Sequence, residues 1–129
     1  FGYHPVDLLE RPSVVDEQQK ALKEIHKALP NDIAVLVGAI VPNVSKRGKP
    51  FWNAAVLLEK RKPAKIFAKQ LLPTYDVFDE GRHIQPGEIA KNIFRFKGRK
   101  ILVTICEDIW AWPNKNFPGY SRYGENPLL

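Results

Sequence analysis

The 129-residue sequence predicts an α/β sandwich with a mixed sheet, on three observations. A stretch near the N-terminus spaces its apolar residues as an amphipathic helix does. Residues 33–41 then form a nearly continuous apolar run of strand length, bounded by Asp32 and Pro42. Shorter strand-like segments follow, separated by Gly and Pro, and one helix followed by several strands is typical of layered α/β folds.

The helix is expected over residues 14–29, after an N-terminal loop (residues 1–11) that ends at Pro12. Ser13 is a suitable N-cap, because its side-chain oxygen could accept a hydrogen bond from a free backbone N–H of the first turn. Pro30 ends the pattern. One apolar stripe runs along the helix and consists of Val14, Ala21, Leu22, Ile25, Ala28 and Leu29.

Strands are expected over residues 33–41, 51–59, 65–68, 93–96 and 100–105. The apolar character of the first predicts a strand covered on both faces. The last is expected to be buried and to run directly into Cys106. Residues 71–98 are expected to be irregular apart from the strand at residues 93–96. Loops of that length usually carry function. Residues 112–129 show no periodicity, and both ends of the chain are expected to be truncated.

Composition excludes several classes of protein. No apolar run approaches the ~20 residues that a membrane-spanning helix needs. A single cysteine excludes an intramolecular disulfide and a four-cysteine zinc site. No secretory signal is visible, so a cytoplasmic location is expected. The net charge of +6 comes from clusters beside Gly and Pro without interleaved aromatics, which favours solvated loops over a nucleic-acid surface.

Cys106 is the most informative residue, because it follows an apolar strand and precedes the polar pair Glu107 and Asp108. The end of a buried strand can hold a nucleophile against a cleft. A lone cysteine is, however, more often a small buried apolar residue than a nucleophile. None of the three histidines can be paired with Cys106 from sequence, so a Cys–His arrangement stays open but unsupported.

Lys69 is the other candidate partner for Cys106, since it ends the predicted strand at residues 65–68. A cation beside the sulfur would lower the pKa of the thiol and would stabilise a developing oxyanion. The alternative is one more surface lysine among many.

Several motifs resemble the glutaminase domain of glutamine-dependent NAD synthetases, a branch of the nitrilase superfamily. Residues 69–80 read Lys-Gln-Leu-Leu-Pro-Thr-Tyr-Asp-Val-Phe-Asp-Glu, after Leu-Leu-Glu-Lys at residues 57–60. Residues 105–110 read Ile-Cys-Glu-Asp-Ile-Trp. Residues 2–9 resemble a Gly-Tyr-x-Pro-x-Asp-Leu-Leu segment, and residues 53–56 an Asn-containing second strand. The similarity extends, with gaps, over residues 1–110.

The resemblance implies part of a nitrilase-like α-β-β-α sandwich with mixed sheets. It also implies a Glu-Lys-Cys triad in which Cys106 is the nucleophile and Lys69 the lysine. Tyr75 and Tyr3 would line the glutamine pocket, together with Glu107 and Trp110, and Glu107 would face the substrate's α-ammonium group.

The triad glutamate of that family precedes the Gly-Tyr-x-Pro motif, so it is expected upstream of Phe1. Glu10 lies on the wrong side of the motif to replace it. Residues 1–129 are therefore expected to be a partial glutaminase domain that lacks the first strand, the C-terminal part and the synthetase domain. Such a segment is expected to be inactive alone and to bind no metal or cofactor. ATP and magnesium would belong to the synthetase domain of the same polypeptide, and the intact protein would form a homo-oligomer.

Two alternatives remain open. One is another nitrilase-type enzyme, an amidase or nitrilase, that acts on a different amide or nitrile. The other is a basic binding module without catalytic activity, in which Cys106 is merely buried.

Overall fold

The computed structural model describes residues 5–45 and 47–109. A short 3-10 helix (Val6–Glu10) leads into α1 (Pro12–Ala28), and the strands β1 (Ala34–Pro42), β2 (Phe51–Glu59) and β3 (Lys65–Ala68) follow. Two 3-10 turns (Glu80–Arg82 and Ile89–Lys91) precede β4 (Ile93–Phe96) and β5 (Arg99–Leu102). A further 3-10 turn, Cys106–Ile109, ends the described part. In this part of the chain, no helix combines the length and apolarity that crossing a membrane requires.

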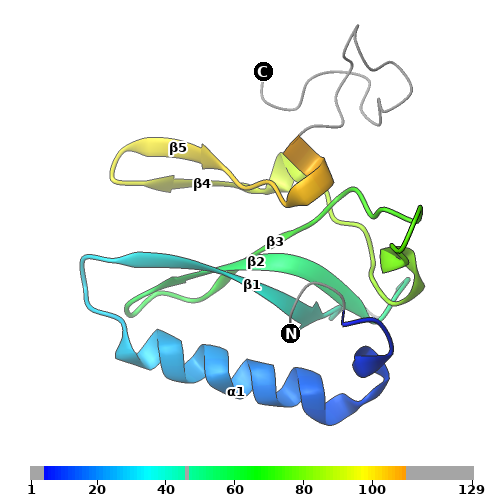
Figure 1. Ribbon diagram of the computed structural model, residues 1–129. Coiled ribbons are helices and arrows are strands. Elements are labelled where there is room, and N and C mark those ends of the chain that lie inside the picture. The colour runs from blue at the N-terminus through cyan, green and yellow to red at the C-terminus, as the bar shows by residue number, and fades with distance from the viewer. Residues whose placement is uncertain (1–4, 46, 110–129) are drawn as a thin grey trace, which may run out of the picture.

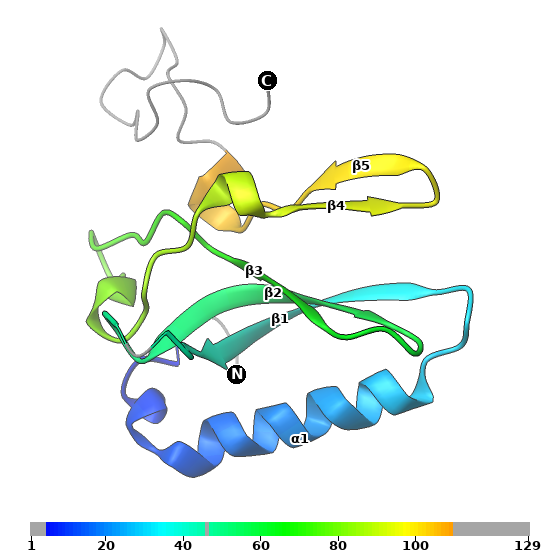
Figure 2. The ribbon, with the colours of Figure 1, turned by 180° about the vertical axis from the view of Figure 1, so that it is seen from behind.

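The elements form three layers (Figures 1 and 2). A sheet of order β1-β2-β3 lies in the middle, with α1 on one face and the β4-β5 hairpin on the other. Both views show the turn that carries Cys106, drawn in orange, on the hairpin side. The α/β class is confirmed. The strand pairs in the described residues are antiparallel, and the parallel component expected of a mixed sheet is limited there to one bridge between Phe51 and Ile84.

The helix begins earlier than the sequence predicts. Pro12 is its first residue and Arg11 its N-cap, without a side-chain capping bond, so Ser13 is not the cap. A proline suits the first helical position because its fixed φ is helical and its missing N–H has no intrahelical acceptor there. Within the segment expected to be an irregular loop, Val6–Glu10 form the 3-10 helix.

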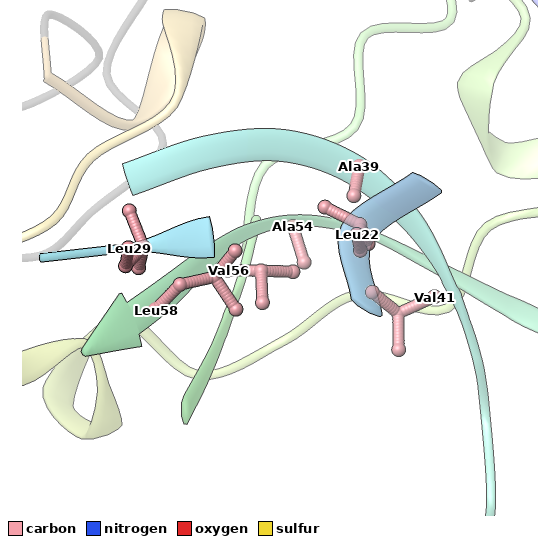
Figure 3. Close-up of a cluster of buried hydrophobic side chains, with 7 residues drawn as sticks. All are labelled: Leu22, Leu29, Ala39, Val41, Ala54, Val56 and Leu58. Atoms are coloured by element: carbon pink, nitrogen blue, oxygen red, sulfur yellow. The ribbon is translucent and has the colours of Figure 1, made fainter. Parts of the chain in front are cut away.

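β2 is the central strand, and its side chains alternate between the two faces of the sheet. Both sets are buried, because each face is covered by another layer. Ala54, Val56 and Leu58 pack toward α1. Figure 3 shows this cluster, which also contains Leu22, Leu29, Ala39 and Val41. On the opposite face, Ala55 and Leu57 belong to a cluster with Phe67, Phe94 and Val103. The rings of Phe67 and Phe94 stack with centroids 5.4 Å apart, which joins β3 to the hairpin.

β1 was expected to be covered on both faces, but only Ala39, Ile40 and Val41 are buried. Leu36 is 46% exposed, because it lies opposite Leu57 on the face away from α1, at the edge of the described sheet. At this edge the side-chain amide of Gln18 takes the place of a neighbouring peptide. Its Oε1 accepts from the Ile40 N–H at 3.0 Å, and its Nε2 donates to the Ile40 carbonyl at 2.6 Å.

The strand expected over residues 100–105 is wrong in extent and burial. β5 ends at Leu102, and its residues are exposed or half-buried because it pairs only with β4 in a two-stranded ribbon. Residues 103–105 continue as irregular chain to Cys106. The strands expected over residues 51–59, 65–68 and 93–96 are confirmed at those bounds.

Candidate active site

Lys69 directly follows β3, and its side chain is fully buried. It shares a face of the sheet with Phe67, two residues earlier, because strand side chains alternate. Its backbone is held on both sides. The N–H donates to the Asn53 carbonyl at 2.8 Å, and the carbonyl accepts from the Gly87 N–H at 2.7 Å.

The Lys69 ammonium is paired with Glu80, whose Oε2 lies 2.6 Å from Nζ. The other oxygen of this carboxylate accepts from Asn53 Nδ2 at 3.4 Å. The parallel bridge between Phe51 and Ile84 brings the turn that carries Glu80 alongside β2. A buried ammonium is costly unless an anion compensates it, and Glu80 supplies that anion.

Glu80 is the residue of this site that the sequence analysis missed. It ends the motif at residues 69–80, yet eleven positions across an irregular segment give no periodicity that predicts contact between the two side chains. The available signal was an acidic residue eleven positions after the candidate lysine, in the same motif.

Cys106 is exposed and opens the last 3-10 turn. Its φ of 54° lies in the left-handed region, which costs a residue with a side chain about 1–2 kcal/mol. Such strain persists only where the surrounding structure fixes it, and it is concentrated at functional sites.

Lys69, Glu80 and Cys106 border one cavity of about 400 Å³, although no solvent reaches the lysine. Asn53 and Ile105 line the same cavity, and Gly38 to Ile40 of β1 form part of its wall. A volume of this order suits a small ligand. The cavity therefore combines an accessible thiol, a buried cation and a carboxylate.

Tyr75 and Glu107, predicted as substrate contacts, lie against each other. The Tyr75 hydroxyl donates to Glu107 Oε2 at 3.4 Å, and the Tyr75 ring packs edge-on to Phe78. Glu107 is only 2% exposed, whereas Tyr75 is 39% exposed. Neither is among the residues that border the 400 Å³ cavity. Tyr3 and Trp110, the other two predicted contacts, lie outside the described residues.

The two described histidines are placed away from the thiol. His26 Nε2 lies 2.8 Å from the Glu59 carbonyl at the helix, and neither His26 nor His83 borders the cavity of Cys106. His83 lies 3.7 Å from Glu10, in a cluster with Asp7. Arg82 pairs with both of those carboxylates, at 2.9 and 3.3 Å, so the cluster is an ion-pair network. In the described residues, the structure gives a Cys–His arrangement no support.

No family model matches the sequence. The glutamine-dependent NAD(+) synthetase of a Synechocystis strain is 42% identical over 99% of this chain, which spans 23% of that protein. The enzyme of the same name from Acinetobacter baylyi is 34% identical over 86% of the chain, which spans 19% of it.

The fold comparison agrees with the sequence comparison. A solved structure of glutamine-dependent NAD+ synthetase from Acinetobacter baumannii, in complex with ADP, superposes with a TM-score of 0.72 at 33% identity. The match covers 86% of this chain and 20% of that structure. The chain thus spans about a fifth to a quarter of the length of the relatives it matches.

Proposed function

We propose, from the premise that this chain is homologous to a segment of glutamine-dependent NAD(+) synthetases, that it carries the nucleophile of a glutaminase. The observation that supports this most directly is the single cavity bordered by Cys106, Lys69 and Glu80. Residues 1–129 would then be part of a nitrilase-like glutaminase domain within a longer polypeptide.

The reaction is hydrolysis of the side-chain amide of glutamine. The Cys106 sulfur attacks the amide carbon, and the C–N bond breaks as the nitrogen takes up a proton and leaves as ammonia. Water then attacks the thioester carbon, releasing glutamate and restoring the thiol. The general base for both steps would be the triad glutamate that is expected upstream of Phe1.

Lys69 would stabilise the negative charge that develops on the amide oxygen. A buried cation is effective in this role because its field is weakly screened and its position is fixed before the reaction begins. Glu80 and Asn53 fix that position, since Glu80 contacts the ammonium and Asn53 contacts both Glu80 and the backbone of Lys69.

Substrate selection would fall to the Tyr75–Glu107 pair, with Tyr3 and Trp110. The half-exposed Tyr75 can be reached by a ligand, and Glu107 behind it offers the negative charge that an α-ammonium group prefers.

The ammonia would serve an ATP-dependent amidation in a synthetase domain of the same polypeptide, converting nicotinic acid adenine dinucleotide to NAD. The names and greater length of the relatives support this, and the solved relative binds ADP. ATP and magnesium would be bound by that domain, and the intact protein would form a homo-oligomer. The present segment alone would be inactive, because removing a general base costs roughly 10²–10⁴-fold in rate.

A glutamine-mimicking diazoketone tests the proposal on the full-length protein. We expect stoichiometric labelling of Cys106, located by peptide mass spectrometry, protection by glutamine, and loss of label in the Cys106→Ser variant. Labelling by simple nitriles but not by the diazoketone would indicate a different nitrilase-type enzyme. A thiol that reacts with neither until the protein unfolds would overturn the proposal and favour the non-catalytic alternative.

A further inference from the structure

Asp108 joins the two segments that carry the candidate catalytic residues. Its side chain is fully buried, two residues after Cys106. We propose that Asp108 is a positioning residue, which holds Cys106 and Lys69 at the same cavity by accepting backbone hydrogen bonds from both segments. The proposal rests on the glutaminase function proposed above.

The first arm of the contact reaches the segment that follows Lys69. Asp108 Oδ1 accepts from the Leu71 N–H at 2.9 Å and from the Gln70 N–H at 3.2 Å. The Gln70 N–H also lies 3.4 Å from Oδ2. These donors are one and two residues beyond Lys69. Fixing them therefore restricts the position of the Lys69 backbone, from which the side chain extends.

The second arm closes the turn around Cys106. Asp108 Oδ2 accepts from the Ile105 N–H at 3.3 Å, while the Asp108 N–H donates to the Ile105 carbonyl at 3.2 Å. Both bonds span Cys106, whose φ of 54° needs such constraint to persist.

Regular structure does not provide this link. β3 ends at Ala68 and β5 at Leu102, so both candidate catalytic residues lie beyond the strands that precede them. β3 and β5 also belong to different sheets. A buried carboxylate that accepts from both segments fixes their separation in a way that apolar packing, which is not directional, does not.

The substitution Asp108→Asn isolates this role, because it keeps the volume and replaces one accepting oxygen by a donating NH₂ group. In either orientation of the amide, its NH₂ group then lies against a backbone N–H that the carboxylate had accepted from. We expect kcat for glutamine hydrolysis by the full-length protein to fall roughly 10²-fold, the loss typical of a misplacement near 1 Å, with KM changed by less than about threefold.

Two controls separate positioning from a loss of stability. Asp32→Asn makes the same chemical change at an exposed turn and should leave kcat unchanged. Leu22→Ala removes a core contact under the sheet, so it should lower Tm and yet leave kcat unchanged at temperatures where the protein is folded. Active-site titration with the diazoketone gives the folded, labelled fraction for each variant.

Amide hydrogen exchange measures the protection of the N–H groups that bond to Asp108, and it does not require an active enzyme. In Asp108→Asn the amides of Gln70, Leu71 and Ile105 should exchange roughly tenfold faster or more, with the β2 amides unchanged. If those three amides stay protected and kcat is unaltered, the positioning role is wrong while the glutaminase proposal stands. If the wild-type protein does not hydrolyse glutamine but the exchange pattern changes as described, the glutaminase proposal fails and the structural link remains.

Discussion

Gly87 lies against Ala68 with no room for a side chain between them. A β-carbon at Gly87 would be 2.5 Å from the Ala68 carbonyl oxygen and 2.6 Å from its β-carbon. The Gly87 N–H also donates to the carbonyl of the next residue, Lys69. This close approach of two backbones sets the position at which β3 delivers the lysine to the cavity.

Gly87→Ala should therefore destabilise the protein by about 1–3 kcal/mol, the usual cost of overpacking a site whose neighbour is backbone. Chemical denaturation of the full-length protein measures this change. Gly38→Ala is the matched control, because a β-carbon there meets no heavy atom within 4 Å. Equal stability of the two variants would show that the loop of Gly87 moves freely away from β3.

Removing the charge of Glu80 should cost more than removing its partner. Glu80→Gln leaves the fully buried Lys69 ammonium without its anion, and breaking a buried pair in this way costs about 3–5 kcal/mol. Lys69→Met also leaves its partner unpaired but should cost less, because the Glu80 side chain is 16% exposed and keeps its contact with Asn53, whereas the lysine is fully buried; glutamine hydrolysis is lost.

The exposed pair of Lys91 and Glu88 is the control for this comparison. Its atoms are also 2.6 Å apart, but its side chains are 73% and 67% exposed. Glu88→Gln should change the free energy of unfolding by less than about 1 kcal/mol, because solvent screens the pair. A loss at Glu80 no larger than at Glu88 would contradict the buried-pair interpretation.

Asn92 links the hairpin to β3 and should not tolerate a carboxylate. It is 2% exposed, and its Nδ2 donates to the Ala68 carbonyl at 2.8 Å. Asn92→Asp turns this donor into an anion facing a carbonyl, with a cost of about 1–3 kcal/mol or more at neutral pH.

The Asn92→Asp defect should shrink in acid. Burial beside a carbonyl raises the folded-state pKa of the new carboxyl above the unfolded value of about 3.9, so protonation favours the folded state. Stability relative to wild type is then highest below pH ~4 and falls as pH rises through the folded-state pKa. Asn31→Asp, at an exposed turn, should show no such dependence when unfolding is followed from pH 3 to 8.

Cys106→Gly should stabilise the protein while abolishing its reactivity. Glycine adopts φ near 54° without the clash of a β-carbon, so relief of strain should contribute about 1 kcal/mol or less after the entropy of the unfolded glycine is counted. Cys106→Ser keeps the strain and should leave Tm unchanged. Arg61→Gly, in the turn before β3 at φ 61°, should give a similar gain with the label at Cys106 retained. A Cys106→Gly variant that is less stable than Cys106→Ser would contradict this account.

The sequence predicted the strands better than their surroundings. β2, β3 and β4 have the predicted bounds, because Pro50 and Pro63 precede β2 and β3, and charged turns that begin at Lys60 and Lys97 follow β2 and β4. β5 is shorter than its apolar run, because its partner segment ends. The Val103 N–H still donates to the Asn92 carbonyl, but the residues before Asn92 form the 3-10 turn Ile89–Lys91 and offer no further strand to pair with.

The two chemically suggestive residues, Lys69 and Cys106, could be selected from their positions after apolar segments. The contacts around them could not be predicted, because Glu80 reaches Lys69 across eleven residues and Asp108 reaches Gln70 across thirty-eight. No periodic pattern in the sequence predicts either contact. Both depend on loops whose course is set by tertiary hydrogen bonds.

Among the described residues, the side-chain amide of Gln18 covers the N–H and the carbonyl of one residue, Ile40, at the outer edge of β1. Strand geometry turns the N–H and carbonyl groups of Leu36 and Gly38 to the same side as those of Ile40, and both residues are exposed. Open edges of this kind recruit other strands, so this length of polypeptide, handled alone, should aggregate as its concentration rises. A lysine in place of Leu36 is the first remedy to try when preparing the segment for spectroscopy.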